Sequence, residues 1–190
     1  MNFLAHSYLT FTDEQIVGQF LQDFIRNQDR FSFPLPIQEG ITLHREIDTF
    51  TDAHPEIQEA KKIFSPLVRL YAGAFVDVAL DYFLANSLSE PELDAHVKKV
   101  YAALKKYKSL QPPVMQRMTD GMARDNWLSQ YRHDQGIYYS VQNVLNKANY
   151  LEKDLPVFPL FLNNKEKLQQ HFDHFFPDLL AHVKIVEASF

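Results

Sequence analysis

The sequence predicts an all-α fold, and three observations lead to that prediction. Apolar residues recur with a period near 3.6 along most of the chain, whereas strict alternation is scarce. Only 5 glycines interrupt the 190 residues. Two helix-start motifs, Thr12 with Gln15 and Ser89 with Glu92, have the spacing of capping boxes. We therefore expect one helical domain over residues 1–190, with about seven or eight helices.

The expected helices follow one another with short connections. Pro55 and Pro66 each suit the first turn of a helix, and Pro177 is expected to break or kink the last one. Apolar periodicity and these start signals place the helices at about residues 13–26, 37–50, 55–64, 65–87, 89–108, 114–131, 136–150 and 165–188.

Composition excludes several classes of protein. Apolar residues make up 46% of the chain and aromatic residues 14%, which is too many for a disordered polypeptide. The absence of cysteine excludes disulfides, thiolate zinc sites, iron–sulfur clusters and cysteine nucleophiles. A net charge of −5 argues against nucleic acid as a partner.

No targeting or membrane-spanning segment is expected. The N-terminal stretch Met1–His6 lacks the basic region and the long apolar core of a signal peptide. The most apolar stretch, about residues 67–88, contains Arg69, Asp77 and Asp81, which make a membrane span costly. We therefore expect a soluble, cytoplasmic protein with no membrane partner. The sequence does not indicate its oligomeric state.

A histidine and an aspartate share the apolar face of the second expected helix. His44 and Asp48 are four residues apart and lie on the same side as Ile37 and Ile41. Two interpretations stay open at this point. The pair belongs to a functional site, or His44 is an ordinary core histidine while Asp48 pairs with Arg45.

The long apolar helix carries a second pair with the same spacing. Asp77 and Asp81 have almost only apolar neighbours, so at least one carboxylate is expected to be buried. Two stacked carboxylates in a low dielectric repel each other and need a compensating positive charge. A metal ion bound by both is one solution, and Gly73 leaves space above Asp77 for it. An arginine from another helix is the alternative.

Taken together, six His and Asp side chains lie on or beside apolar helix faces. They are His6, Asp23, His44, Asp48, Asp77 and Asp81. Nitrogen and oxygen ligands of this kind suit Mn²⁺, Mg²⁺, Fe²⁺ or Zn²⁺, and helical bundles build metal sites from facing helices. Such an ion lowers the pKa of bound water and polarises a phosphoryl oxygen. The sequence has no glycine-rich phosphate loop, GxSxG elbow or HExxH motif.

Several segments, in order along the chain, resemble the acyl carrier protein phosphodiesterase family. The resembling segments are Met1–His6, Gly18–Phe24, Gly40–Asp48, Phe50–Pro55, Asp77–Ala85 and, more weakly, Val141–Asn146. The family looks like a divergent, all-helical branch of the metal-dependent HD phosphohydrolases. One position departs from its pattern, because residue 82 is Tyr where the family often has His.

The resemblance implies a reaction, a partner and a cofactor. The reaction is hydrolysis of the phosphodiester that joins phosphopantetheine to a serine of holo-acyl carrier protein, a step linked to fatty acid biosynthesis. The expected cofactor is Mn²⁺ or Mg²⁺. By motif position, His44, Asp48 and one or both of Asp77 and Asp81 hold the ion. His6 or Asp23 completes the ligand shell or transfers protons.

Two other functions remain open from the sequence. One is a phosphohydrolase of the HD type that acts on a nucleotide or another small phosphodiester. The other is a non-catalytic helical binding module whose acidic residues form structural ion pairs. Acyl carrier proteins are acidic, so a basic docking patch is expected on the first interpretation. The leading candidate is the lysine run Lys98, Lys99, Lys105, Lys106 and Lys108, and the alternatives are Lys61, Lys62, Arg26 and Arg30.

Overall fold

The computed structural model describes residues 2–190, and all regular secondary structure in that range is helical. The prediction of an all-α fold is therefore confirmed. The α-helices are α1 Phe3–Tyr8, α2 Asp13–Leu21, α3 Leu35–Ala53, α4 Pro55–Val68, α5 Ala72–Ser87, α6 Glu90–Lys106, α7 Pro113–Arg124, α8 Trp127–Gln130, α9 Asp134–Lys147, α10 Val157–Asn163 and α11 Lys165–Glu187. Short 3₁₀ segments add η1 Gln22–Phe24, η2 Asn27–Ser32, η3 Arg69–Tyr71 and η4 Lys108–Leu110.

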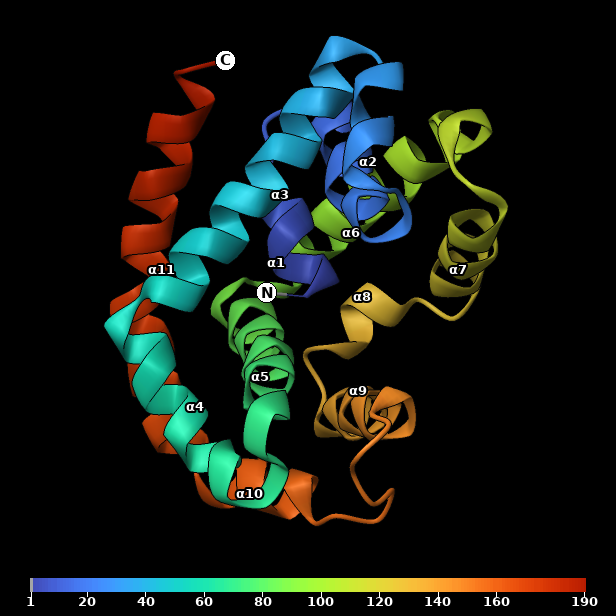
Figure 1. Ribbon diagram of the computed structural model, residues 1–190. Helices are drawn as coiled ribbons and strands as arrows, with labels where there is room; N and C mark the ends of the chain where they lie inside the picture. The colour runs from blue at the N-terminus through green and yellow to red at the C-terminus, as the bar shows by residue number, and fades with distance from the viewer. Residues whose placement is uncertain (1) are drawn as a thin grey trace.

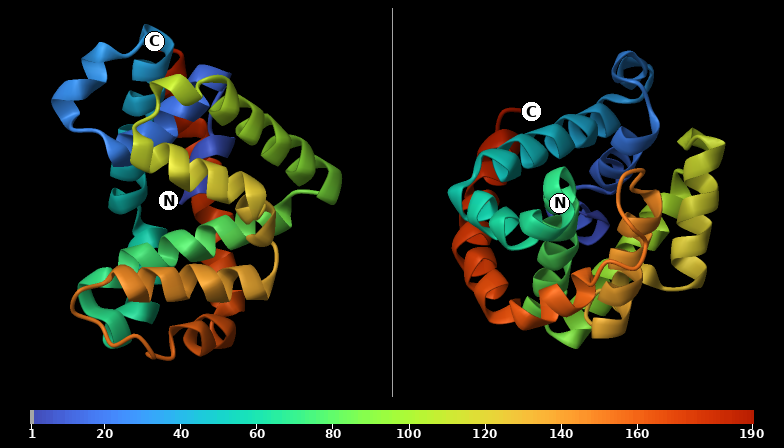
Figure 2. Two further views of the ribbon diagram at one scale, coloured as in Figure 1. Left: turned by 90° about the vertical axis from the view of Figure 1, so that its right-hand side faces the viewer. Right: turned by 60° about the horizontal axis from the view of Figure 1, so that its bottom comes forward.

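The helices surround two central elements, α1 and α5 (Figure 1). Helices α3 and α4 follow each other along one side, and α11 packs against both of them. Helices α6 to α9 form the opposite side, where α9 packs against α5 (Figure 2). The short helix α1 lies between α2 and α5 and contacts both, so its side chains reach the interior of the protein.

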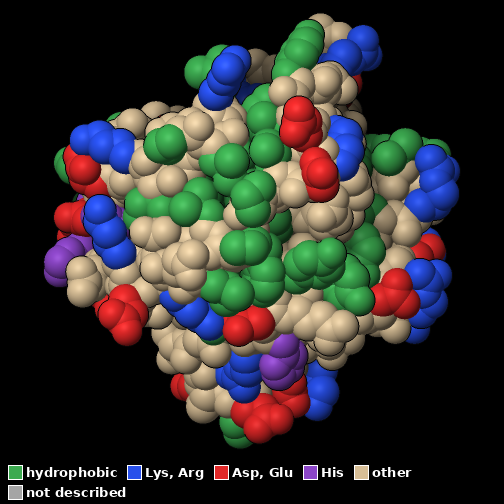
Figure 3. Space-filling model, turned by 90° about the horizontal axis from the view of Figure 1, so that it is seen from below, with side chains coloured by type: hydrophobic (Ala, Val, Ile, Leu, Met, Phe, Trp, Pro, Cys, Tyr) green, Lys and Arg blue, Asp and Glu red, His purple; other side chains and the backbone are tan. Residues whose placement is uncertain are grey.

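Helix α5 supplies much of the hydrophobic core. Phe75, Val76 and Phe83 are each at most 2% exposed, and they pack with Phe64 of α4 and Phe161 of α10. The helical run Pro55–Ser87 is long and apolar enough to cross a membrane by length and composition alone, a test that core helices also pass. Other apolar side chains remain at the surface and gather on the face seen from below (Figure 3).

Several helix boundaries differ from the sequence prediction. Pro66 lies inside α4 instead of starting a helix, and the break falls at Arg69, where φ is 52°. The helix expected to reach Tyr131 ends at Arg124, because Asn126 takes a left-handed conformation before α8. Pro177 lies within α11 without interrupting it. The eight expected helices correspond to α2–α7, α9 and α11, while the short α1, α8 and α10 were not predicted.

Both predicted helix starts are present, with different details. The Ser89 and Glu92 pair forms the full capping box. At α2, the Thr12 hydroxyl accepts a hydrogen bond from the Gln15 N–H at 3.2 Å, but the Gln15 side chain accepts from the Phe11 N–H instead of closing the box.

Two glycines allow α2 and α3 to pack backbone against backbone. A Cβ added at Gly18 would lie 2.3 Å from the carbonyl oxygen of Ile37, and one added at Gly40 would lie 2.5 Å from that of Gln15. Real Cβ atoms essentially never come so close. Glycine at these positions therefore sets the distance between α2 and α3. Helix α3 carries His44, and the segment with Asp23 directly follows α2.

Candidate metal centre

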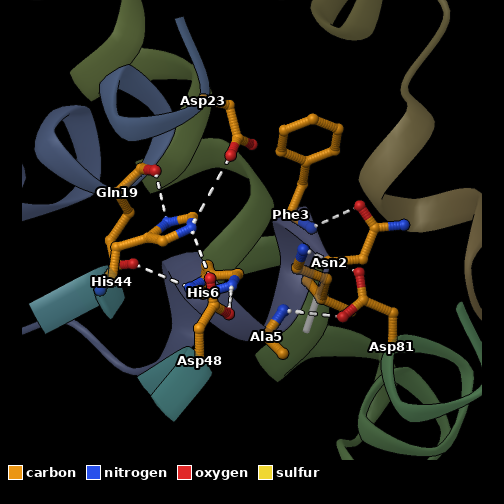
Figure 4. A network of polar contacts seen from close by, with 10 residues as sticks. Asn2, Phe3, Ala5, His6, Gln19, Asp23, His44, Asp48 and Asp81 are labelled. Carbon is orange, nitrogen blue, oxygen red and sulfur yellow. Dashed lines mark hydrogen bonds and ion pairs between the residues drawn. The ribbon is translucent and has the colours of Figure 1, made fainter. Parts of the chain in front are cut away.

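Three predicted site residues meet at the centre of the molecule. His6 lies on α1, and His44 and Asp48 lie one turn apart on α3. Each side chain offers one ligand atom, and the three atoms lie within 4.8 Å of one another (Figure 4). The structure therefore joins the N-terminal motif and the α3 motif into one group that could hold a metal ion.

The two imidazoles aim the same nitrogen at the same carboxylate. His6 Nε2 lies 3.2 Å from Asp48 Oδ1, and His44 Nε2 lies 3.1 Å from Asp48 Oδ2. The rings stack with centroids 3.9 Å apart and planes only 7° from parallel. Both histidine side chains are buried, whereas that of Asp48 is 45% exposed. The group is therefore a buried pair of nitrogens that opens to solvent on the carboxylate side.

Gln19 of α2 contacts the other nitrogen of both rings. His44 Nδ1 lies 2.8 Å from the main-chain oxygen of Gln19, and His6 Nδ1 lies 2.9 Å from its side-chain Oε1. A carbonyl oxygen only accepts hydrogen bonds, so His44 must carry a proton on Nδ1. That carbonyl belongs to the last turn of α2, where backbone oxygens lack a full set of helical partners.

The environment favours a neutral His6 beside an ionised Asp48. Burial lowers the pKa of His6 to about 4, although its contact with Asp48 acts in the opposite direction. Burial also works against ionisation of Asp48, but its contacts with the His44 and His6 rings outweigh it and hold the pKa of that carboxyl well below its usual range. His6 thus presents a lone pair at neutral pH.

A cation fits between these side chains better than protons do. With the single ring proton on Nδ1 and turned to Gln19, the Nε2 of each ring would face the Asp48 carboxylate as one acceptor facing another, at 3.1–3.2 Å. Protonating both rings would instead stack two positive charges 3.9 Å apart. The Nε2 atom of His6 is buried and makes no hydrogen bond within the part of the chain that the structure describes. Two nitrogens and a carboxylate suit a divalent transition ion.

Asp23 lies at the rim of this group. It belongs to η1, directly after α2, and its Oδ1 is 3.8 Å from His44 Nε2. Its side chain is 51% exposed. Partial burial raises the pKa of Asp23, although His44 acts against that shift. A half-exposed carboxyl with a raised pKa beside a metal group is well placed to exchange protons with water or substrate.

Asp81 lies at the start of α1. Its carboxylate accepts hydrogen bonds from the backbone N–H groups of Leu4 and Ala5 at 3.0 and 3.1 Å, so it caps the start of α1. Burial raises the pKa of Asp81 to about 7, and those two N–H groups reduce the shift. The compact ligand group does not include Asp81. This carboxylate instead holds the helix that carries His6.

Asp77 and Tyr82 occupy the same helix without joining the ligand group. Burial raises the pKa of Asp77, and the nearby charge of Asp48 adds to that shift. Tyr82 packs edge-on against Phe83 and Phe161, with the Lys165 ammonium 4.3 Å from its ring centroid. Phe83 lies on α5 itself, Phe161 on α10 and Lys165 on α11, so the departure from the family pattern lies in that aromatic packing.

The sequence analysis missed Gln19. Its signal was a polar residue in the middle of the apolar run Ile16–Leu21, and the structure buries its side chain to 1% exposure. One of its two contacts with the histidines is made by its main-chain oxygen, and a pattern of side chains cannot reveal such a contact.

The fold and the site together define an all-helical protein with a buried two-histidine, one-aspartate group suited to a divalent metal ion. Comparison with known proteins is more specific. The family model described as acyl carrier protein phosphodiesterase matches residues 1–179, and the chain belongs to this family.

Individual relatives agree with the family model. Proteins named acyl carrier protein phosphodiesterase from Salmonella agona (strain SL483), Salmonella dublin and Salmonella newport (strain SL254) are each 30% identical to this chain over 186 residues. The matched region covers 95% of this chain and 96% of each relative. No solved structure matches the chain significantly.

Proposed function

We propose that this protein hydrolyses the phosphodiester between phosphopantetheine and a serine of holo-acyl carrier protein, releasing apo-acyl carrier protein and phosphopantetheine. Family membership supports the substrate. The observation that carries the chemistry is the convergence of His6, His44 and Asp48 on one small volume. We propose that residues 1–190 act as one cytoplasmic phosphohydrolase domain, and its relation to HD phosphohydrolases stays a prediction.

We propose that the reaction depends on a divalent ion, Mn²⁺ or Mg²⁺, held by His6 Nε2, His44 Nε2 and Asp48. Such an ion would lower the pKa of water and stabilise negative charge on the phosphoryl oxygens. The Nε2 atoms lie 3.1 and 3.2 Å from the Asp48 oxygens, so the three side chains are close enough that all of them could bind one ion.

The surrounding residues would orient the group and handle protons. Asp81 holds the first turn of α1, which fixes the position of His6. Asp23 stands at the solvent side with a raised pKa, so it is the residue we assign to accepting and returning a proton. Asp77 is close enough for its charge to interact with that of Asp48, and we assign it an electrostatic role.

The test is conversion of holo-acyl carrier protein to the apo form by metal-free protein with and without added Mn²⁺, followed by mass spectrometry. The proposal predicts a loss of the phosphopantetheine mass only when Mn²⁺ is present. Hydrolysis of small phosphodiesters without any action on the carrier protein would favour the alternative of a small-molecule phosphohydrolase. Absence of both activities would favour a binding module.

The position of the site also distinguishes the candidate docking patches. Lys106 lies 3.7 Å from Asp13 at the start of α2, and Lys108 pairs with Asp120 at 2.7 Å. Asp23 follows the opposite end of α2. Two of the five cations in the lysine run predicted from the sequence therefore already face carboxylates, and Lys106 lies at the end of α2 that is remote from Asp23.

We propose that the segment with Arg26 and Arg30 receives the acidic carrier protein. Both residues follow Asp23 closely in the chain, and the Arg26 side chain is 78% exposed despite its contact with Asp29. The Arg30 guanidinium lies 4.5 Å from the ring centroid of Phe31, which is 67% exposed. Charge reversal at Arg26 and Arg30 should lower kcat/KM for the carrier protein at low salt more than reversal at Lys105 and Lys106. The opposite ranking would return the docking site to α6.

A further inference from the structure

We infer that Gln19 is the positioning residue of the metal group, because it presents an acceptor to the Nδ1 of both histidines and so leaves both Nε2 atoms free to bind an ion. The inference rests on the proposed function for its metal, but not for the identity of the substrate. Gln19 contacts neither Asp48 nor Asp23 in the network of Figure 4. It acts through the two rings.

The two contacts from Gln19 have different chemical origins. The contact to His44 uses the main-chain oxygen, so it survives any change of side chain at this position. The contact to His6 uses the side-chain Oε1 at 2.9 Å, so it depends on the amide. A substitution at Gln19 should therefore remove the contact to His6 and keep the contact to His44. His44 then serves as an internal control within the same variant.

The amide at position 19 also has a donor without a partner among residues 2–190. Its Nε2 is buried and makes no hydrogen bond to any of them. Leaving a buried donor unpaired carries a cost. An amide turned the other way would place that N–H against His6 Nδ1 and require the proton on His6 Nε2, where it would block an ion. The Oε1 contact in the structure is thus the orientation that metal binding requires.

Histidines that bind a metal ion usually have a hydrogen-bond acceptor at the ring nitrogen that does not bind the ion. The second ring nitrogen usually donates its proton to a carboxylate or a carbonyl, which fixes the tautomer and the ring orientation. Here one residue supplies both acceptors, and the close approach of α2 and α3 at Gly18 and Gly40 brings its main-chain oxygen to His44. The two rings that contact Gln19 stack nearly parallel to each other.

A graded series at position 19 tests the inference through Mn²⁺ affinity, measured by calorimetry on the purified full chain. Gln19→Leu removes the acceptor and keeps a similar volume, so it should weaken Mn²⁺ binding by about 10- to 100-fold. Gln19→Glu keeps an acceptor and has no donor, so it should bind Mn²⁺ at least as tightly as the wild type. A residue that only filled space would give the reverse order, because a buried carboxylate is tolerated less well than leucine.

Matched controls exist one turn earlier on the same helix. Gln15 is also 1% exposed, but its side chain contacts Phe11 and Glu187 instead of the histidines. Gln15→Leu and Gln15→Glu should leave Mn²⁺ affinity within about twofold of the wild type. If Gln15→Leu weakened binding as much as Gln19→Leu, helix destabilisation would explain the loss and the inference would be wrong.

Imidazole nitrogen NMR provides a second readout that needs no activity. With Zn²⁺ as a diamagnetic probe, His6 and His44 should both carry the proton on Nδ1 in the wild type. In Gln19→Leu, His44 should keep that tautomer, while His6 should lose it. A wild-type His6 with its proton on Nε2 in the loaded protein would overturn the inference. Wild-type protein that binds Mn²⁺ but does not act on the carrier protein would contradict the proposed substrate and leave the role of Gln19 supported.

Discussion

Helix α3 contributes to two histidine clusters of different design. In the first, His6 and His44 both aim Nε2 at Asp48. In the second, which lies between the α3–α4 corner and α11, the histidines face three different carboxylates, and His171 and His174 share one of them, Glu56. His171 contacts Glu56 at 2.6 Å, His54 contacts Asp178 at 3.3 Å, and His182 lies 3.9 Å from Glu46.

The comparison shows that histidine and carboxylate content does not by itself bring three ligand atoms together. In the first cluster, the Nδ1 atoms of both histidines contact Gln19, and their Nε2 atoms face the same Asp48 carboxylate. In the second, the contacts spread along the length of α11 and join pairs of helices. Among the described residues, only the first cluster brings three ligand atoms within 4.8 Å. We therefore interpret the second as structural support for the packing of α11.

The largest expected effect separates the two clusters directly. Asp48→Asn should reduce hydrolysis of holo-acyl carrier protein by more than the roughly 100-fold that loss of an outer-shell partner costs, because it removes the ligand that faces both histidines. His171→Ala in the second cluster should change turnover by less than about twofold. Steady-state rates from mass spectrometry of the carrier protein measure both. Comparable losses in the two variants would contradict the distinction.

The next effect concerns the helix contact that makes the first cluster possible. Gly18→Ala should destabilise the protein by about 1–3 kcal/mol, since the new methyl group would meet the Ile37 carbonyl at 2.3 Å. Gly121→Ala in α7 is the control, where a Cβ would meet only Trp127 at 3.9 Å. That variant should be neutral or gain up to about 1 kcal/mol from helix propensity. Urea unfolding gives both values, and equal losses would argue against the close α2–α3 contact.

A pH effect should report on the support of His6. Asp81 has its pKa raised to about 7, so between about pH 4 and 7 the folded state keeps a proton that the unfolded state releases. Its contribution to stability therefore falls as pH rises through that window. His6, whose pKa is lowered to about 4, has the opposite effect over the same range.

The difference between wild type and Asp81→Asn isolates the aspartate. The wild type should lose stability relative to this variant from pH 4 to 7, and the difference should level off above about pH 7. Denaturant melts at several pH values measure it. A difference that stays constant over the whole range would show that the pKa of Asp81 is not raised.

The smallest effect belongs to the second cluster. The hydrogen bond from His171 lowers the pKa of Glu56, a partly exposed group at the start of α4. Glu56→Gln should lower the melting temperature slightly, because exposed pairs contribute little, and should leave Mn²⁺ affinity unchanged. A clear loss of Mn²⁺ binding would mean that the two clusters are coupled through α3 and α4.

The sequence predicted the long helices because each one has a continuous apolar face. It did not predict α1, α8 and α10, which are too short to show a helical period. The error at Pro66 has a similar cause, since proline near a serine favours a helix start, while the left-handed break at Arg69 has no glycine to mark it.

The site was predictable in part. The spacing of His44 and Asp48 placed both on one apolar face, and the structure brings His6 to them. The sequence analysis expected Asp81 to bind the ion and did not predict α1. The first N–H groups of this helix need an acceptor, and Asp81 provides it. Gln19 could not be predicted as a support, because its contacts depend on how closely α2 and α3 approach.

The most direct test of the account is pulsed electron paramagnetic resonance on the full chain titrated with Mn²⁺. The account predicts one tightly bound Mn²⁺ per chain with couplings from two histidine nitrogens, of which His44→Ala removes one and His171→Ala removes none. A spectrum of free aqueous Mn²⁺, or nitrogen couplings that survive His44→Ala and disappear in His171→Ala, would contradict it.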